Sequence, residues 1–379
     1  MIIGNSYNWL FFITLAFFIK IIPKKIHCLA FFISGCLFVY HYSPLCFFFY
    51  FPFTMFITYF SMDKSIEKNH IWLFIFVLFF IVFYHENFNH YQKIGILPLE
   101  ILVLGFYNLM RVLHVFIESC FHKKKFNPGQ LMAYLWYAPI LFSGPVERME
   151  EWKKYHLLVI KIDWKRVFKL LIRAIVFAYL AEFFYTNFTP NNINFKTATY
   201  LNTFLYSIFI GIVIYCRLSS YIDFTRSFSI VMGYPFKRPN FRSPHFSLSV
   251  ASFWSRWNMS VARFATDYII VSSLKHFSKK KLILTLFVNF LVVGLCHGME
   301  IPLILWGALQ AIAISTNITY LYLKHKNPIL LRLDMKYFHP FIKWLITLTF
   351  LYLTSILIDP RAKEVFEALI LPFKNIIFF

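Results

Sequence analysis

The chain has 379 residues, of which 59% are hydrophobic and only 15% charged, and its formal net charge is +21. This composition excludes an ordinary soluble domain, because too few polar residues remain to cover a surface that faces water. Long apolar segments instead predict an all-α polytopic membrane protein, since the short polar–apolar alternation of a β-barrel is absent from the sequence.

Hydropathy predicts a series of apolar segments along the chain. The expected spans are 7–22, 27–40, 45–60, 71–85, 95–118, 168–187, 200–222, 282–297, 301–323 and 341–358, with a short apolar segment at about 364–379. Several are short for a full crossing, so tilted or partial spans are expected. We expect one membrane-embedded domain over 1–379, with N-terminal helices in 1–126, a motif-bearing core in 127–310 and C-terminal helices in 311–379.

Positive charge is concentrated in alternate loops of the first third of the chain. The residues are Lys20, Lys24, Lys25, Lys64, Lys68, Lys123, Lys124 and Lys125. Cytoplasmic loops of membrane proteins carry such an excess, so the pattern predicts an extracytoplasmic N-terminus in a multi-pass cell (inner) membrane protein. Attraction to anionic lipid headgroups is a further explanation of the same charges. This placement favours a lipid bilayer over a nucleic acid as the partner.

Two proline-rich segments, 139–145 and 233–244, are not expected to form regular helices, because proline removes a backbone donor and clashes with the preceding turn. We expect 129–142 to form a re-entrant pair. Irregular backbone at membrane depth needs cover from protein or from a water-filled cavity, so the middle of the chain is expected to surround a funnel. The six cysteines contain no Cys-x-x-Cys pair, and we expect neither a disulfide framework nor a metal site.

His297 is the first candidate for chemistry, since it lies in an apolar run within the segment Gly-Leu-Cys-His-Gly at 294–298. A histidine at membrane depth is costly unless it is used or paired, and imidazole can accept a proton near neutral pH. On a helix, Gly294 and Gly298 lie beside it and leave room for a substrate or a closely packed helix. The alternative is a packed histidine bonded to a neighbouring carbonyl. Cys296 would point about 100° away from His297, which disfavours a cysteine–histidine nucleophile.

Residues 252–268 are predicted to form one helix. Trp254, Trp257, Asn258 and Val261 then share a face, and Asn258 is a candidate to orient a substrate or stabilise an oxyanion. An interfacial aromatic belt with an incidental asparagine explains the same spacing equally well.

The charged residues of this helix fall on a different face. They are Arg256, Arg263 and Asp267, of which Arg263 and Asp267 are spaced to pair.

Charged residues near 223–242 are the remaining candidates. Asp223 is expected to form a structural ion pair with Arg226, three residues further on. Lys237, Arg238 and Arg242 have the chemistry to bind donor phosphates, although loops on the cytoplasmic side carry such residues in any case.

Several short motifs occur together in a fixed order. They are Ser-Gly-Pro-Val-Glu-Arg at 143–148, Tyr-Ile-Asp at 221–223, Gly-Tyr-Pro-Phe at 233–236, Asn-Phe-Arg-Ser-Pro at 240–244, Phe-Trp-Ser-Arg-Trp-Asn-Met-Ser at 253–260, Asp-Tyr at 267–268, Gly-Leu-Cys-His-Gly at 294–298 and Leu-Trp-Gly at 305–307. In this order they resemble the membrane-bound O-acyltransferase (MBOAT) family. The resemblance covers about 143–307 and is greatest to the bacterial branch with alginate O-acetyltransferase and the teichoic acid D-alanyl transfer protein.

The resemblance implies a ring of about 11 transmembrane helices, with re-entrant segments, around a central tunnel. It also implies that His297 is the catalytic histidine and that Asn258 is the second motif residue, which is usually histidine in the bacterial branch. Cys296, Thr266 and Gln310 depart from the residues common in that branch.

We therefore expect an O-acyltransferase that moves a short acyl group, with acetyl favoured, from a cytoplasmic thioester to a hydroxyl of an extracytoplasmic envelope polysaccharide. His297 would deprotonate the hydroxyl, Asn258 would hold the acceptor or the oxyanion, and Trp254 and Trp257 would line the tunnel. Arg256 and Asp267 would brace the site. The donor would be acetyl-CoA or another acyl thioester, with no bound cofactor, and a separate extracytoplasmic acyl-transfer protein is a candidate partner.

Three alternatives stay open. Within the family, a D-alanyl or other carrier-protein donor would replace acetyl-CoA. A transporter would need coupled carboxylates in the spans, where the sequence offers only Glu100, Glu118 and Glu182. An inactive scaffold would tolerate loss of His297.

Overall fold

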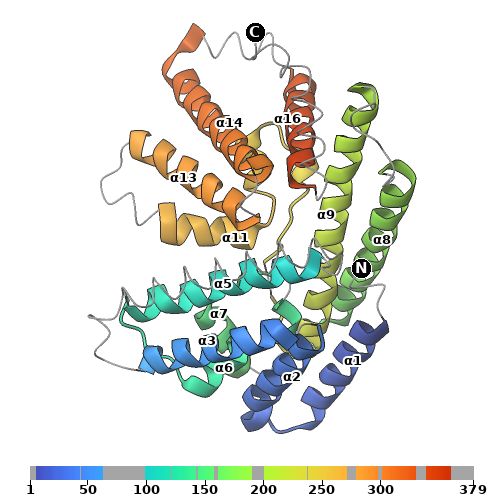
Figure 1. The fold of residues 1–379 in the computed structure, drawn as a ribbon, viewed down its shortest axis with the longest axis vertical. Coiled ribbons are helices and arrows are strands. Elements are labelled where there is room, and N and C mark those ends of the chain that lie inside the picture. The colour runs from blue at the N-terminus through green and yellow to red at the C-terminus, as the bar shows by residue number, and fades with distance from the viewer. Residues whose placement is uncertain are drawn as a thin grey trace. The chain divides into compact units, whose positions relative to one another are not determined.

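The computed structural model describes residues 6–42, 44–62, 99–120, 122–141, 144–157, 161–189, 200–236, 238–270, 279–297, 301–329 and 339–359. Within these ranges every regular element is a helix, as predicted. The chain divides into two compact units (Figure 1). The first comprises 1–176 and 220–238, and the second comprises 177–219 and 239–379.

The helices of the first unit come mainly from the N-terminal half of the chain. They are α1 (Ser6–Ile21), η1 (Lys24–Ile26), α2 (His27–Tyr42), α3 (Pro44–Met62), α5 (Leu99–Cys120), α6 (Pro128–Leu135), η3 (Ala138–Ile140) and α7 (Met149–Leu157), with the first part of α8 (Trp164–Phe188) and the last part of α9 (Tyr200–Val231).

The second unit holds the rest of α8 and α9 and the C-terminal helices. These are η4 (Pro244–Phe246), α10 (Val250–Trp254), α11 (Met259–Phe264), the π-helical turn η5 (Ala265–Ile270), α13 (Lys279–His297), α14 (Ile301–Lys326), α16 (Pro340–Ser355) and η6 (Ile356–Ile358).

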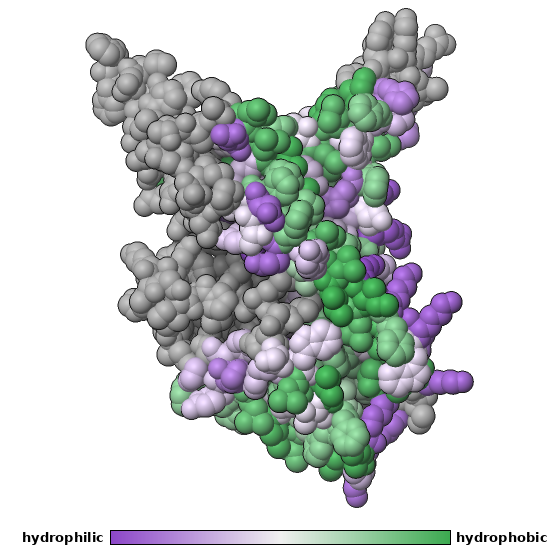
Figure 2. Space-filling model, turned by 90° about the vertical axis from the view of Figure 1, so that its right-hand side faces the viewer, coloured by the Kyte–Doolittle hydropathy of each residue, from purple (hydrophilic) through white to green (hydrophobic). Residues whose placement is uncertain are grey.

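Four described helices are long and apolar enough to cross a bilayer. They are Lys24–Tyr42, Leu201–Val231, Ile301–Lys326 and Pro340–Ile358. Large apolar side chains lie on the outside of the molecule, as Figure 2 shows for one face, and Phe17 is 68% exposed. Water would penalise such exposure, whereas lipid tails would not. The expected span 71–85 and the segment 364–379 lie outside the described residues.

Helix α9 extends nine residues beyond the predicted end at residue 222 and stops at Val231. Hydropathy predicts that the span ends just before Asp223, because a carboxylate is costly in an apolar environment. Here Asp223 and Arg226 are both buried and form an ion pair, so their polar groups have partners inside the first unit. The helix can therefore continue past them.

The expected irregular segment after α6 is buried in the first unit, with residues 131–141 all inaccessible or nearly so. Arg111 of α5, which is 0% exposed, donates hydrogen bonds to the backbone carbonyls of Tyr134, Leu135 and Ile140. Asn108 donates in the same way to Leu141, over 3.0 Å. These side chains supply the donors that the non-helical backbone lacks, which is the cover that such a segment requires.

Helices α13 and α14 lie side by side in the second unit (Figure 1), and they approach closely because two glycines face each other. A Cβ on Gly294 would lie 2.7 Å from the carbonyl oxygen of Leu303 and 3.2 Å from the Cα of Gly307. Small residues allow helix backbones to pack in this way in membranes. Of the two uses predicted for the space beside Gly294, the structure shows the closely packed helix.

Gly294→Ala should therefore destabilise the protein by about 1–3 kcal/mol, the usual effect of overpacking, because backbone atoms must move. The melting temperature in detergent measures this. Gly129→Ala is the matched control, since its Cβ would meet only the Asn127 side chain at 3.4 Å. Equal melting temperatures for the two variants would contradict the described helix contact.

Candidate functional site

The prediction of one helix over 252–268 is wrong, because the helix is interrupted between the end of α10 at Trp254 and the start of α11 at Met259. Asn258 has φ 43° and ψ 52°, which is the left-handed region, and it precedes α11. Asparagine is among the residues that tolerate this conformation best. Trp254, Trp257 and Asn258 consequently do not share one helical face, and each must be placed by its own contacts.

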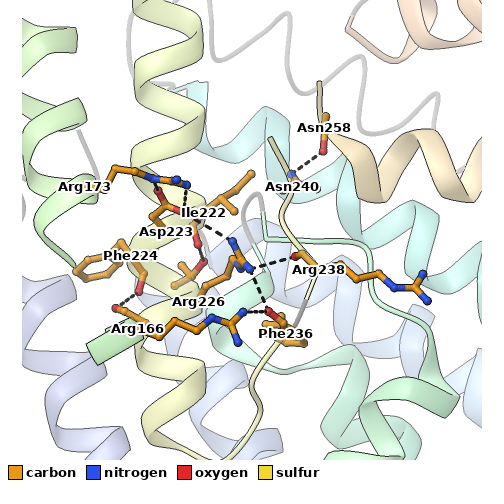
Figure 3. A network of polar contacts seen from close by, with 12 residues as sticks. Arg166, Arg173, Ile222, Asp223, Phe224, Arg226, Phe236, Arg238, Asn240 and Asn258 are labelled. Atoms are coloured by element: carbon orange, nitrogen blue, oxygen red, sulfur yellow. Dashed lines mark hydrogen bonds and ion pairs between the residues drawn. The ribbon is translucent and has the colours of Figure 1, made fainter. Parts of the chain in front are cut away.

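A loop preceding α10 holds the break in place through Asn240, which is 2% exposed. The Asn240 carbonyl accepts from the backbone N–H of Met259 (2.8 Å), and its side-chain Oδ1 accepts from the N–H of Ser260 (3.0 Å). The Asn240 Nδ2 donates to Oδ1 of Asn258, over 2.9 Å (Figure 3). The first backbone N–H groups of a helix have no partner within it, and here Asn240 accepts from those at the start of α11. This gives a physical reason why a new helix begins after Asn258.

Trp254 connects this region to α13 and α14. Its indole packs edge-on against Phe290 of α13 and Trp306 of α14, with ring centroids 5.2 and 5.8 Å apart. Its Nε1 donates to Oε1 of Gln310 (3.1 Å). Val293 of α13 belongs to the same apolar cluster. The segment that carries Asn258 is thus fastened to two helices of the second unit.

The contacts on α13 follow one helical face that leads to position 297. Phe290, Val293 and Gly294 stand in i, i+3, i+4 order, and position 297 is i+7 on a helix that ends at His297. The side chain of His297 lies outside the described residues, as do the side chain of Cys296 and residue Gly298. The backbone register still assigns position 297 to the face that packs on Trp254.

The remaining predicted residues of this region have separate surroundings. Trp257 stacks on Phe253, with centroids 5.2 Å apart, and meets the edge of Phe241. The carbonyl of Arg256 accepts from the N–H of Arg242, over 3.0 Å.

The last part of the region lies in and beside the π-helical turn. Asp267 lies exposed in that turn. Arg263 donates from Nε to the Met259 carbonyl, within its own helix.

Gln310, noted in the sequence only as a departure, is a buried bridge between three helices. It accepts from Trp254 and donates from Nε2 to Oγ1 of Thr354 in α16, over 2.8 Å. Asn240 was part of a recognised motif, yet its role was missed. Both are buried amides, and a buried amide requires partners. The amide side chains themselves are the one signal that the sequence offered.

His245 is a second histidine of this unit that the sequence reasoning overlooked. Its Nδ1 lies 2.9 Å from the hydroxyl of Tyr352, and its carbonyl accepts from the indole of Trp344, over 2.7 Å. Burial lowers the pKa of His245 to about 4. The imidazole is therefore neutral at physiological pH and attaches η4 to α16.

In the first unit, Asp223 is the centre of an arginine cluster (Figure 3). Arg173 of α8 binds both of its carboxylate oxygens, and Nη1 of Arg226 lies 3.8 Å from Oδ1. Asp223 is 1% exposed. The predicted ion pair with Arg226 is confirmed, and Arg173 is an additional partner that sequence spacing could not reveal.

The same cluster fixes the chain that follows α9. Arg166 and Arg226 both donate to the carbonyl of Phe236, and Arg226 also donates to that of Arg238. The guanidinium of Arg238 is exposed and lies 3.6 Å from a carboxylate oxygen of Glu151. Lys237 lies outside the described residues. No group of three or more metal-ligating side chains occurs in the part of the chain that the structure describes.

The family model of the membrane-bound O-acyltransferases matches residues 118–358, which include all the positions described above from Asp223 to Gln310. The chain belongs to this family. The chain is 27% identical over 209 residues to the peptidoglycan O-acetyltransferase of Helicobacter pylori, and this match covers 54% of the chain and 36% of that protein. It is 25% identical over 208 residues to the teichoic acid D-alanyltransferase of Bacillus subtilis, covering 51% of this chain and 52% of that protein.

A third relative matches a shorter region of this family member. It is a probable alginate O-acetylase of Pseudomonas syringae, 32% identical over 96 residues, which cover 25% of this chain and 18% of that protein. The matches thus span about half or less of the curated relatives. The predicted membership of the family, with bacterial envelope enzymes among the relatives, is confirmed.

Asp223→Asn should destabilise the first unit, because Arg226 would remain buried without its carboxylate partner. We expect a loss of about 3 kcal/mol, the lower end for breaking a buried pair, since the Arg173 side chain is 40% exposed. Thermal unfolding in detergent measures this. Glu182→Gln is the control, because its exposed position on α8 predicts a change within about 0.5 kcal/mol. Similar melting temperatures for both variants would show that the arginine cluster contributes little.

Proposed function

We propose that this protein is an O-acyltransferase that moves a short acyl group, with acetyl favoured, from a cytoplasmic thioester to a hydroxyl of an extracytoplasmic envelope polysaccharide. One observation carries the proposal: Trp254 fastens the segment that presents Asn258 to the face of α13 that leads to position 297. Trp254 thus joins the segment before Asn258 to the helix that carries position 297, which supports a joint role for the two residues that the family resemblance implies. The names of the relatives supply the substrate class, since two are O-acetyl-transferring enzymes of envelope polymers.

In the proposed reaction, His297 accepts the proton of the acceptor hydroxyl while its oxygen attacks the thioester carbonyl. The carbonyl oxygen gains negative charge in the tetrahedral intermediate, and Asn258 holds either that oxygen or the acceptor. When the carbon–sulfur bond breaks, the imidazolium returns the proton to the leaving thiolate. The products are an ester on the polysaccharide and a free thiol. Both substrates are bound together, so no acyl-enzyme forms.

The other candidate residues take supporting roles. Trp254 and Trp257 would line the tunnel, within the ring of about 11 helices and re-entrant segments that the family resemblance implies. Arg256 and Asp267 would brace the segment around Asn258. The exposed guanidinium of Arg238 is suited to a phosphate of the donor. We assign Asp223 a structural role, because Arg173 binds both of its oxygens.

The proposed setting is the cell (inner) membrane, with an extracytoplasmic N-terminus. A separate extracytoplasmic acyl-transfer protein is a candidate partner for delivery to the polymer. A carrier-protein donor is the second candidate for the thioester, because the Bacillus subtilis relative is a D-alanyltransferase.

Transfer of radiolabelled acetyl from acetyl-CoA to envelope polysaccharide, in membranes that contain the protein, tests the proposal. We expect label with the wild type and a loss of about 100- to 10,000-fold with His297→Ala, which is the usual contribution of a general base. A parallel assay with an acylated carrier protein separates the two donor classes.

Trp164→Ala provides the matched control, because Trp164 is an exposed residue at the start of α8, outside the second unit. It should transfer label at the wild-type rate. Equal transfer by the wild type and a correctly inserted His297→Ala would contradict the mechanism. Absence of transfer from both donors would favour a scaffold or a transporter instead.

A further inference from the structure

The orientation of one side-chain amide in the second unit follows from a backbone contact. The N–H of Ser260 can only donate, so the atom of Asn240 that lies 3.0 Å from it must be the amide oxygen. The nitrogen of the same amide is then the atom that meets Asn258, at 2.9 Å. Oxygen and nitrogen of an asparagine are otherwise easily exchanged in a structure, but this contact removes the ambiguity.

The polarity of Asn240 in turn determines that of Asn258. An N–H donor needs an acceptor, so Asn258 must present its Oδ1 to Asn240. The Nδ2 edge of Asn258, with two N–H donors, therefore points away from the loop that holds Asn240. The hydrogen bonds therefore run in one direction, from the Ser260 N–H to Asn240 and from Asn240 to Asn258. Figure 3 shows the second of these bonds.

The backbone keeps this arrangement in place. Asn240 is 2% exposed and Ser260 is 1% exposed, so water does not compete effectively for their bonds. The Asn240 carbonyl also accepts from Met259, and Arg242 donates to the Arg256 carbonyl. Four bonds thus join residues 240–242 to residues 256–260, on both sides of Asn258. A side chain positioned in advance in this way loses little entropy when it binds a reacting group.

We propose that Asn240 is a positioning residue that directs the N–H edge of Asn258 to the reacting carbonyl, so that Asn258 donates to the oxyanion rather than accepting a hydrogen bond from the acceptor hydroxyl. This inference rests on the proposed function, and it decides between the two roles that the proposed function leaves to Asn258. A neutral imidazole also combines one donor with one acceptor, so histidine at 258 would fulfil both requirements.

Three substitutions test the polarity. In Asn258→Asp, the carboxylate still accepts from Asn240 but has lost its N–H donors, and kcat should fall about 100-fold with KM nearly unchanged. Asn258→His keeps a donor and an acceptor and should stay within about tenfold of the wild type. In Asn240→Asp, the carboxylate accepts from Ser260 but cannot donate to Asn258. The Asn258 amide should then turn around, and kcat should fall at least about tenfold.

The pH profile gives a readout that a purely structural role would not change. A protonated carboxyl regains an O–H donor, so the rate of Asn258→Asp relative to the wild type should rise as the pH falls. The ratio of the two rates cancels any pH dependence that the variant and the wild type share. Asn187→Asp is the control for one added negative charge, since Asn187 is exposed on α8, and it should transfer at the wild-type rate.

All variants are assayed for acetyl transfer in membranes, with the melting temperature in detergent as the check on folding. If Asn240→Asp fails to fold, the two substitutions at position 258 still test the role of the Asn258 N–H edge, because they leave the bond from Ser260 to Asn240 intact. A wild-type rate for Asn258→Asp, or a relative rate that rises with pH, would overturn the inference while the proposed function stands. Absence of transfer by the wild type itself from both donor classes would overturn the proposed function and this inference with it.

Discussion

The contact of the Trp254 indole with α13 and α14 is the interaction on which the described site depends. Trp254 ends α10, four residues before Asn258, and packs on Phe290 and Trp306. Its one polar atom donates to Gln310, which in turn donates to Thr354. A partly buried tryptophan at this point contributes a large apolar area and needs a partner for its N–H. Three helices and the segment before Asn258 are thereby held in a fixed relation within the second unit.

The close approach of α13 and α14 makes that contact possible. Gly294 and Gly307 bring the two backbones together, so that one indole can touch side chains from both helices. In a membrane, helix association relies on such close packing, because lipid tails solvate apolar side chains as well as other helices do. The Gly-Leu-Cys-His-Gly motif therefore has a structural role, because its Gly294 permits the close helix pair that supports Trp254.

The sequence predicted most described helices closely, because the boundary between apolar and polar residues falls within about one helical turn of the ends of α2, α13 and α14. It failed at α9, where Arg173 of α8 binds the Asp223 carboxylate and the carbonyls of Phe236 and Arg238 accept from Arg226.

The sequence failed again at Asn258, where hydrogen bonds from Asn240 interrupt an apparently helical pattern. Both failures arise from partners distant in the sequence. Periodicity registers only neighbours, so it identified Asn258 and Trp254 as candidates but assigned them to a helical face that does not exist.

We propose that Asn258 and His297 act as one reaction centre, and a double-mutant cycle tests this most directly. Asn258→Gly removes the amide and keeps a residue that accepts the left-handed backbone. If the two side chains act on the same transition state, the rate of acetyl transfer by the double variant should be close to that of His297→Ala alone. Strictly multiplicative losses would show that the two residues act independently and would contradict the account.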